Sequence, residues 1–151
     1  MQLVPITQAG TALVPLAELA SVVSAVLQAT AAMYGRTGYE PPWIGYLATE
    51  GGRCVGTCGF NGPPKDREVE IAYFTFAGNE GAGVATRMAS ALIEITRSAE
   101  SVHAAVYAHT LPEESASTAI LRRLRFAFVG EVIHPEDGKV WKWRLNENAE
   151  A

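Results

Sequence analysis

The chain has 151 residues, of which 48% are hydrophobic, with a formal net charge of -4 and an isoelectric point near 5.4. This length is enough for one domain that buries its core without metals or disulfides. The acidic balance argues against nucleic-acid binding, which selects for clustered Lys and Arg. We therefore expect a single domain over residues 1–145, followed by a frayed tail at residues 146–151.

The two cysteines, Cys54 and Cys58, lie in a predicted strand. At that spacing their Cα atoms would be roughly 13 Å apart, too far for a disulfide. No cluster of His and Cys surrounds them as a zinc site would require, and unpaired cysteines fit a reducing compartment. The apolar stretch at residues 13–33 is too interrupted by polar residues to span a membrane. We expect a cytoplasmic protein with no metal and no membrane or nucleic-acid partner.

Hydrophobic periodicity predicts strands and helices in the order β, α, three β, α, β, α, two β. Strands are expected at residues 2–7, 43–48, 53–60, 68–76, 102–109, 126–133 and 139–145. Helices are expected at residues 11–33, 81–98 and 112–124, the last of them starting near residues 113–115. Residues 34–43 are expected as a loop because glycines and adjacent prolines interrupt the pattern. Hairpins combined with one strand-helix-strand passage are typical of an α+β fold with helices packed on the faces of a mixed sheet.

The segment at residues 74–86 is the most informative for function. A predicted strand runs into a helix through glycines at positions 78, 81 and 83. The first N–H groups of a helix are unpaired, and together with the helix dipole they favour an anion. Gly81 and Gly83 would let a diphosphate approach the backbone, and Thr86 adds a hydroxyl. Val84-Ala85 stand where a Walker loop needs Lys and Ser or Thr. The alternative is that the glycines only turn the chain.

Five segments taken together resemble the GNAT superfamily, in the branch that includes acetyltransferases of ribosomal-protein N-termini and many small-molecule acetylating relatives. They are residues 68–73, 81–86, 109–118, 121–126 and 129–131. The resemblance implies a mostly antiparallel, twisted sheet of about seven strands, splayed between the fourth and the fifth. It also implies direct acetyl transfer from acetyl-CoA to a primary amine, either a peptide N-terminus or a small molecule.

The same resemblance assigns the cofactor contacts. The pantetheine arm would lie along the end of the fourth strand, and the pyrophosphate would lie on the glycine loop. The implied residues are Phe74, Thr75, Phe76, Gly81, Ala82, Gly83, Val84, Ala85 and Thr86.

Several positions depart from the family pattern. Glu80 replaces the usual Gln or Arg of the loop, and because a carboxylate near a pyrophosphate is unfavourable, we expect it to face solvent or to pair with a basic neighbour. Glu114 stands for an asparagine, Arg122 for the tyrosine that often serves as the acid, and Arg125 for a glycine. Ala82 likewise replaces a commonly basic or polar residue. Glu80, Ala82, Glu114 and Arg125 keep open an alternative, a non-catalytic acyl-CoA-binding or partner-binding domain of the same fold.

Transfer from a thioester requires a route for the amine proton, donors for the oxyanion and an acid for the thiolate. Glu70 is the expected base, since alternation places Glu68 and Glu70 on one strand face, where two carboxylates about 7 Å apart raise each other's pKa. The alternative is a surface charge. Ser117 is the candidate acid, or else a residue that satisfies the helix N-terminus. A backbone N–H near Phe76 is the expected oxyanion donor.

The remaining expectations concern the histidines, the substrate and assembly. Structural or solvated roles are expected for the three histidines, at positions 103, 109 and 134. The acidic balance mildly favours a cationic acceptor. Four aromatic side chains surround the loop between the first helix and the second strand, and they either form an acceptor wall or pack the loop; they are Tyr34, Tyr39, Trp43 and Tyr46. A homodimer is possible through exposed side chains of the last strand, Val140, Trp141 and Trp143.

Overall fold

The computed structural model describes residues 1–14, 21–99 and 104–146. Its elements, in chain order, are β1 (Gln2–Pro5), α1 (Ser21–Thr37), β2 (Gly45–Glu50), β3 (Arg53–Phe60), β4 (Glu68–Thr75), α2 (Val84–Ser98), β5 (Ala105–Thr110), α3 (Ala116–Arg123), β6 (Phe126–His134) and β7 (Gly138–Leu145). Parts of the predicted helix at residues 11–33 and strand at 102–109, and most of the predicted tail, lie outside the described residues.

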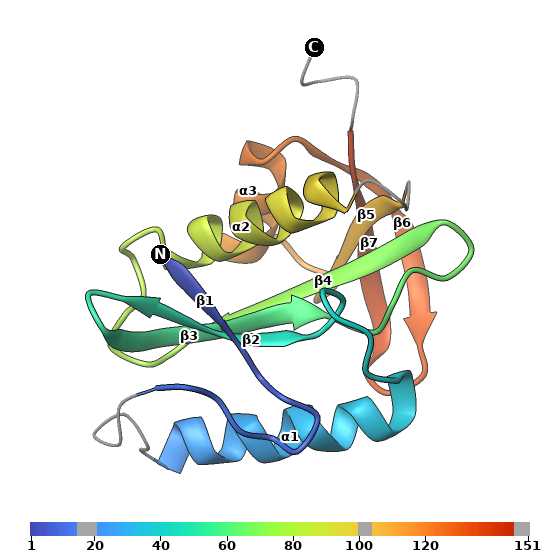
Figure 1. Cartoon of the computed structure of the whole chain (residues 1–151). Coiled ribbons are helices and arrows are strands. Elements are labelled where there is room, and N and C mark those ends of the chain that lie inside the picture. The colour runs from blue at the N-terminus through green and yellow to red at the C-terminus, as the bar shows by residue number, and fades with distance from the viewer. Residues whose placement is uncertain (15–20, 100–103, 147–151) are drawn as a thin grey trace.

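The described strands form one seven-stranded sheet in the order β1-β2-β3-β4-β5-β7-β6. Every neighbouring pair is antiparallel except β4 and β5, which are parallel. Helix α1 covers one face of the sheet, and α2 and α3 cover the other (Figure 1). The α+β fold with helices on both faces is confirmed. None of the described helices is long and apolar enough to cross a membrane.

The sheet splays between β4 and β5, as the resemblance implied. The two strands pair only from Glu68 opposite Ala105 to Glu70 opposite Tyr107. Beyond that point β5 continues beside β7, while β4 continues beside β3. The backbone edge of β4 after Glu70 therefore faces a gap in the sheet, and polar backbone groups at such an edge require a partner from elsewhere.

Helix α1 ends later than the sequence predicts. Residues 34–37, expected as loop, form its last turn, and Gly38 with φ 92° follows it. The hydroxyl of Tyr34 donates to the carbonyl of Ile6 at 2.8 Å and accepts from the N–H of Gly45 at 2.9 Å. These bonds tie the last turn to the sheet, a tertiary contact that overrides the local glycine signal. Residues 11–14, expected in this helix, are not helical.

Helix α3 is shorter than predicted because its N-terminus is fixed by a capping box. Ser115 accepts from the N–H of Thr118, whose hydroxyl accepts from the N–H of Ser115. The helix therefore begins at Ala116, directly after the predicted start near residues 113–115. At its other end Arg125 adopts φ 71°, the left-handed conformation that glycine favours after a helix.

We expect Arg125→Gly to raise the free energy of unfolding by about 1 kcal/mol, because left-handed backbone costs a non-glycine residue about 1–2 kcal/mol. In a domain of this size, this corresponds to a rise in Tm of about 2–4 °C. Thermal unfolding followed by circular dichroism measures the shift. Arg123→Gly, inside the helix, is the matched control and should lower Tm instead. A lower Tm for Arg125→Gly would contradict the argument.

The last strand does not expose the aromatic side chains on which the dimer expectation was based. Val140 and Trp143 are 3% and 1% exposed, and the indole N–H of Trp143 donates to the hydroxyl of Thr110 at 3.0 Å. Large exposed side chains occur on the edge strand β6 instead, at Phe128 and Ile133. The expected exposure was therefore wrong for β7, and the homodimer stays a prediction.

Candidate active site

The glycine loop ends at the N-terminus of α2 with its backbone open to solvent. Gly81 and Gly83 have φ 77° and 76°, conformations that L side chains rarely adopt. Gly83 is the N-cap residue and provides no side-chain cap, while Val84, the first residue of the helix, is buried. The first N–H groups of α2 thus have no capping side chain of their own, the arrangement that suits an anion.

Arg87 holds this loop from the helix side, a role that sequence reasoning missed. Its Nη1 donates to the carbonyl of Ala82 at 2.8 Å, and its Nε and Nη2 donate to the Glu50 carboxylate at 2.7 and 2.8 Å. The hydrogen bond from Arg87 lowers the pKa of Glu50. No sequence signal links Glu50, at the tip of the β2–β3 hairpin, with a helix residue 37 positions away.

Glu80 is exposed, as expected, but it pairs with the backbone and not with a basic side chain. Its Oε1 accepts from the N–H of Gly78 at 2.6 Å. One carboxylate is therefore held within the loop, two residues before Ala82.

The backbone of β4 alternates between the two sides of the strand. The N–H of Phe76 donates to the carbonyl of Val55 at 2.9 Å, and the carbonyl of Glu70 accepts from Asn61, so these residues turn their backbone groups toward β3. By alternation, the backbone groups of Tyr73 and Thr75 face the splay. Because the N–H of Phe76 is already bonded within the sheet, the oxyanion donor expected there is better sought at these two residues.

Two cavities meet at the splay. The larger, about 330 Å³, lies between α1, β3, β4 and the β6–β7 turn, and its lining includes Thr30, Phe74 and Asp137. The smaller, about 120 Å³, lies between β4, β5 and α3, and its lining includes Ala108 and Ser117. We call them the outer and the inner cavity.

Glu70, Ala72 and Tyr73 line both the outer and the inner cavity. A groove of about 860 Å³ beside α2 is larger, but Glu94 is the one titratable side chain among its lining residues, and it does not reach the splay. Size alone therefore does not locate the site.

Glu70 lies at the junction of the two cavities with both carboxylate oxygens engaged. Oε1 accepts from Nδ2 of Asn61 at 3.1 Å, and Oε2 lies 3.1 Å from Nδ1 of His109. The side chains of Glu70 and His109 are 14% and 17% exposed. Burial raises the pKa of Glu70, but the hydrogen bonds from His109 and Asn61 and the nearby imidazole charges outweigh it, so the pKa is lowered.

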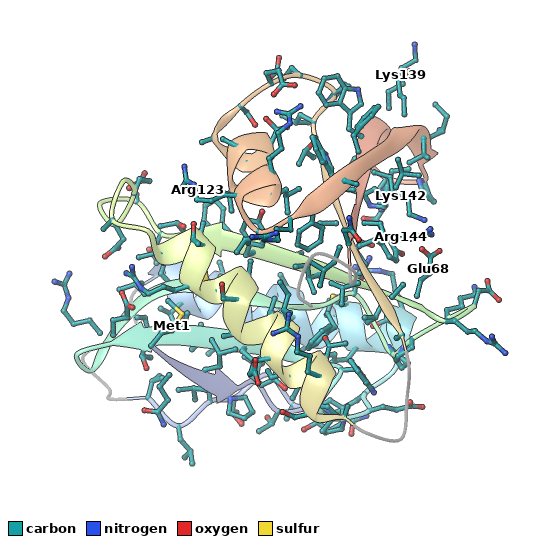
Figure 2. All side chains as sticks on the ribbon, turned by 90° about the horizontal axis from the view of Figure 1, so that it is seen from above. Met1, Glu68, Arg123, Lys139, Lys142 and Arg144 are labelled. Atoms are coloured by element: carbon teal, nitrogen blue, oxygen red, sulfur yellow. The ribbon has the colours of Figure 1, made fainter. Side chains whose placement is uncertain are left out.

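The expected mutual rise in the pKa of Glu68 and Glu70 is therefore wrong. Glu68 binds Lys142, with 3.2 Å between Nζ and Oε1, and also Arg144, as Figure 2 shows at the start of β4. Burial alone would raise the pKa of Glu68, but these two bases lower it. Sequence alternation identified the shared face and missed the cations that the neighbouring β7 brings to it.

His109 and His134 are also closer to the site than the sequence indicated. Their ring centroids are 5.5 Å apart, and one donor atom from each lies within 4.8 Å of a Glu70 oxygen and of the other. A metal would need a free nitrogen on His134. Its Nδ1 accepts from the N–H groups of Glu136 and Asp137 at 3.1 and 3.3 Å, so a neutral ring carries its proton on Nε2. These groups do not make a ligand set as they stand, and His103 lies outside the described residues.

Ser117 lies in the first turn of α3, exposed, and lines the inner cavity with His109. The N-cap of this helix is Ser115, so the hydroxyl of Ser117 is not the group that caps the helix N-terminus. Two departures from the family pattern pair with each other: the Glu114 carboxylate accepts from Nη1 and Nη2 of Arg122 at 2.5 and 2.7 Å. The guanidinium of Arg122 also lies over the Trp143 ring, at 5.0 Å.

The aromatic residues before β2 pack the core and do not line the outer cavity. Tyr34, Trp43 and Tyr46 are 5%, 6% and 6% exposed. Tyr34 stacks edge-on against Tyr39 at 5.0 Å, and Trp43 against Phe60 at 5.1 Å. Of the two interpretations of these residues, the structure supports packing.

Comparison with solved structures shows the same fold in several acetyltransferases. The ribosomal L7/L12 alpha-N-protein acetyltransferase RimL, in complex with coenzyme A, has a TM-score of 0.62 at 20% identity, over 82% of this chain and 70% of that chain. A spermidine N-acetyltransferase SpeG chimera from Vibrio cholerae and hSSAT has a TM-score of 0.64 at 11% identity, over 82% and 81%. An acetyltransferase from Agrobacterium tumefaciens str. C58 has 0.60 at 20% identity, over 85% and 72%.

At these identities the structural likeness shows the fold alone. No curated protein sequence gives a significant match. The sequence model of the acetyltransferase (GNAT) domain matches residues 14–127, more than half of the chain. The protein therefore belongs to the GNAT acetyltransferase family.

Proposed function

We propose that this protein, through one domain over residues 1–145, transfers an acetyl group from acetyl-CoA directly to a primary amine. The observation that carries the proposal is the position of Glu70. Its carboxylate lies where the β4–β5 pairing ends, between an inner cavity on the side of α3 and an outer cavity on the side of α1. A thioester entering from one side and an amine from the other would meet at this point.

The cofactor is proposed to bind along the splay. Its pyrophosphate would lie on the backbone of Gly81, Ala82 and Gly83 and on the first turn of α2, residues 84–86, whose N–H groups and dipole favour phosphate. The amides of its pantetheine arm would pair with the backbone of Thr75 and Tyr73, between the side chains of Phe74 and Phe76. The RimL relative binds coenzyme A, which supports this assignment.

The acceptor is proposed to be a cationic amine, either a peptide N-terminus or a small molecule. The outer cavity is lined by three carboxylates, of Glu70, Glu136 and Asp137. Ion pairing across such a cavity favours a substrate that carries positive charge. Relatives of this fold include a protein N-terminal acetyltransferase and a spermidine acetyltransferase, so both acceptor classes are compatible with it.

Two side chains are proposed to carry the proton chemistry. Removal of the amine proton depends on Glu70, which is at the junction of the cavities. The hydroxyl of Ser117, in the inner cavity, donates a hydrogen bond to the departing thiolate. Arg122, at the position of the family tyrosine, is bound to Glu114 and does not serve as the acid.

Calorimetry with acetyl-CoA and with CoA tests the cofactor site. A dissociation constant at or below the millimolar range is expected, since Arg87, the basic side chain that contacts the loop, is bound to Glu50 and to the carbonyl of Ala82, and the loop offers its backbone donors. Candidate acceptor amines are then screened by measuring the release of free thiol from acetyl-CoA. Small diamines and peptides form separate panels. Absence of binding by either ligand would contradict the proposal.

Glu80→Gln is expected to tighten CoA binding about fivefold. Removing one negative charge several ångströms from a pyrophosphate stabilises the complex by about 1 kcal/mol near a protein surface. The gain should shrink at high ionic strength because exposed charges are screened. Calorimetry at low and high salt measures this. Glu94→Gln, in the second half of α2, is the matched control. An equal gain in CoA affinity in that variant would contradict a local effect of Glu80.

A further inference from the structure

The geometry around His109 fixes which of its ring nitrogens carries a proton. Nδ1 lies 3.1 Å from Oε2 of Glu70, the distance of a hydrogen bond. A carboxylate that is ionised can only accept, so Nδ1 is the donor. In the neutral ring the proton is therefore on Nδ1, and Nε2 offers a free lone pair.

Other charged groups near the pair are already engaged. Asn61 donates to the second oxygen of Glu70, which holds the carboxylate in place. Nζ of Lys142, beside His109 in the sheet, is 4.4 Å from the centroid of the Tyr107 ring and binds Glu68. His134 contacts the ring of His109 edge-on, and its Nδ1 accepts backbone N–H groups. Asp137 lies 3.5 Å from that same Nδ1.

We propose that Nε2 of His109 accepts the proton of the acceptor amine and that Glu70 positions this imidazole instead of taking the proton itself. The proposal rests on the proposed acetyl transfer and names the atom that performs its proton step. His109 lines the inner cavity, where the thioester is expected, and Glu70 reaches both cavities. An oriented imidazole with a carboxylate behind it is an effective general base.

The step balances without another reactant. The acceptor reacts as its neutral amine, after the proton of its ammonium form has passed to solvent. The amine nitrogen attacks the thioester carbonyl and forms the C–N bond, while one amine proton moves to Nε2. The C–S bond breaks with its electron pair on sulfur. The imidazolium, stabilised by Glu70, then returns the proton to the thiolate, giving an amide and a free thiol. His109 thereby takes the amine proton and returns it to the sulfur, while the hydroxyl of Ser117 donates a hydrogen bond to the departing thiolate, in a chain whose tyrosine position holds Arg122.

His109→Asn is the first test, because its amide N–H can keep the bond to Glu70 while the acceptor at Nε2 is lost. We expect kcat to fall about 100-fold or more, with the KM for acetyl-CoA within about twofold of wild type. In His109→Ala, added imidazole should restore part of the rate, which a merely structural histidine would not allow. Glu131→Gln, on the exposed edge strand, is the control and should retain wild-type kcat.

Nuclear magnetic resonance of histidine-labelled wild-type protein tests the same assignment without turnover. The neutral ring of His109 should be protonated on Nδ1 and unprotonated on Nε2. Protonation on Nε2, or a His109→Asn variant that keeps its rate, overturns the proposal while acetyl transfer stands. Wild-type protein that yields no acetylated amine contradicts the proposed function and this proposal together.

Discussion

Gly83→Glu should weaken CoA binding at least about 100-fold. Gly83 has φ 76°, and a Cβ there would lie 2.9 Å from Nη1 of Arg87, the guanidinium that holds the loop. The variant thus pays about 1–2 kcal/mol of backbone strain, disturbs the contact of Arg87 with Ala82, and places a carboxylate where a pyrophosphate is expected. All three effects act on the loop where the pyrophosphate is expected, so each of them adds to the loss of CoA affinity.

Calorimetry with CoA, beside a thermal unfolding curve, measures the effect of Gly83→Glu. Gly138→Glu is the matched control. Gly138, the first residue of β7, has φ 75°, and no heavy atom of the described residues, its chain neighbours aside, lies within 4 Å of where its Cβ would be. The control should lose a similar amount of stability and keep its CoA affinity. If Gly83→Glu bound CoA within about threefold of wild type, the loop would not be the anion site.

Glu70→Gln should lower kcat/KM about 100- to 1000-fold. Asn61 donates to Oε1 of Glu70, so the glutamine oxygen is expected to stay there. Its NH₂ group then replaces Oε2 and donates to Nδ1 of His109, which forces the ring proton onto Nε2. With its proton on Nε2, His109 can no longer accept the amine proton at that atom. The imidazolium form of His109 also loses the negative charge of Glu70 that stabilises it.

The pH profile separates this effect from simple loss of a carboxylate base. The pKa of Glu70 is lowered, so its carboxylate is ionised throughout the neutral range and adds no limb there. Imidazole is the side chain that ordinarily changes protonation near neutral pH. Glu70→Gln should therefore reduce the rate across the whole profile. A rate and profile equal to wild type would show that neither Glu70 nor its contact with His109 takes part.

Local sequence signals were enough for most of the sheet. Strand β3 has its predicted bounds, Arg53–Phe60, and Gly51 and Gly52 adopt the positive φ expected of the hairpin before it. The end of α1 was missed because the hydroxyl of Tyr34 is fixed by bonds to Ile6, just after β1, and to Gly45 of β2, which follows it in the chain. Such contacts exist only after the sheet has formed and leave no local pattern.

In the candidate site, too, local sequence signals identified some residues, while others depend on contacts made by the folded sheet. Alternation identified Glu70 and its face of β4, and the glycines identified the loop. The partner His109 depends on the parallel register of β4 and β5, in which Glu70 is opposite Tyr107 and His109 follows two residues later on the same face. The pairing of Glu114 with Arg122 connects two departures that, taken singly, suggested a damaged site.

Acetyl transfer by this protein is tested by following the acetyl group itself. Wild-type protein is incubated with acetyl-CoA carrying an isotopically labelled acetyl group and with panels of small cationic amines and peptides, and the products are identified by mass spectrometry. We expect labelled amide on at least one primary amine, with release of an equal amount of free CoA. Tight binding of acetyl-CoA without labelled amide on any acceptor would contradict it and favour a non-catalytic acyl-CoA-binding domain.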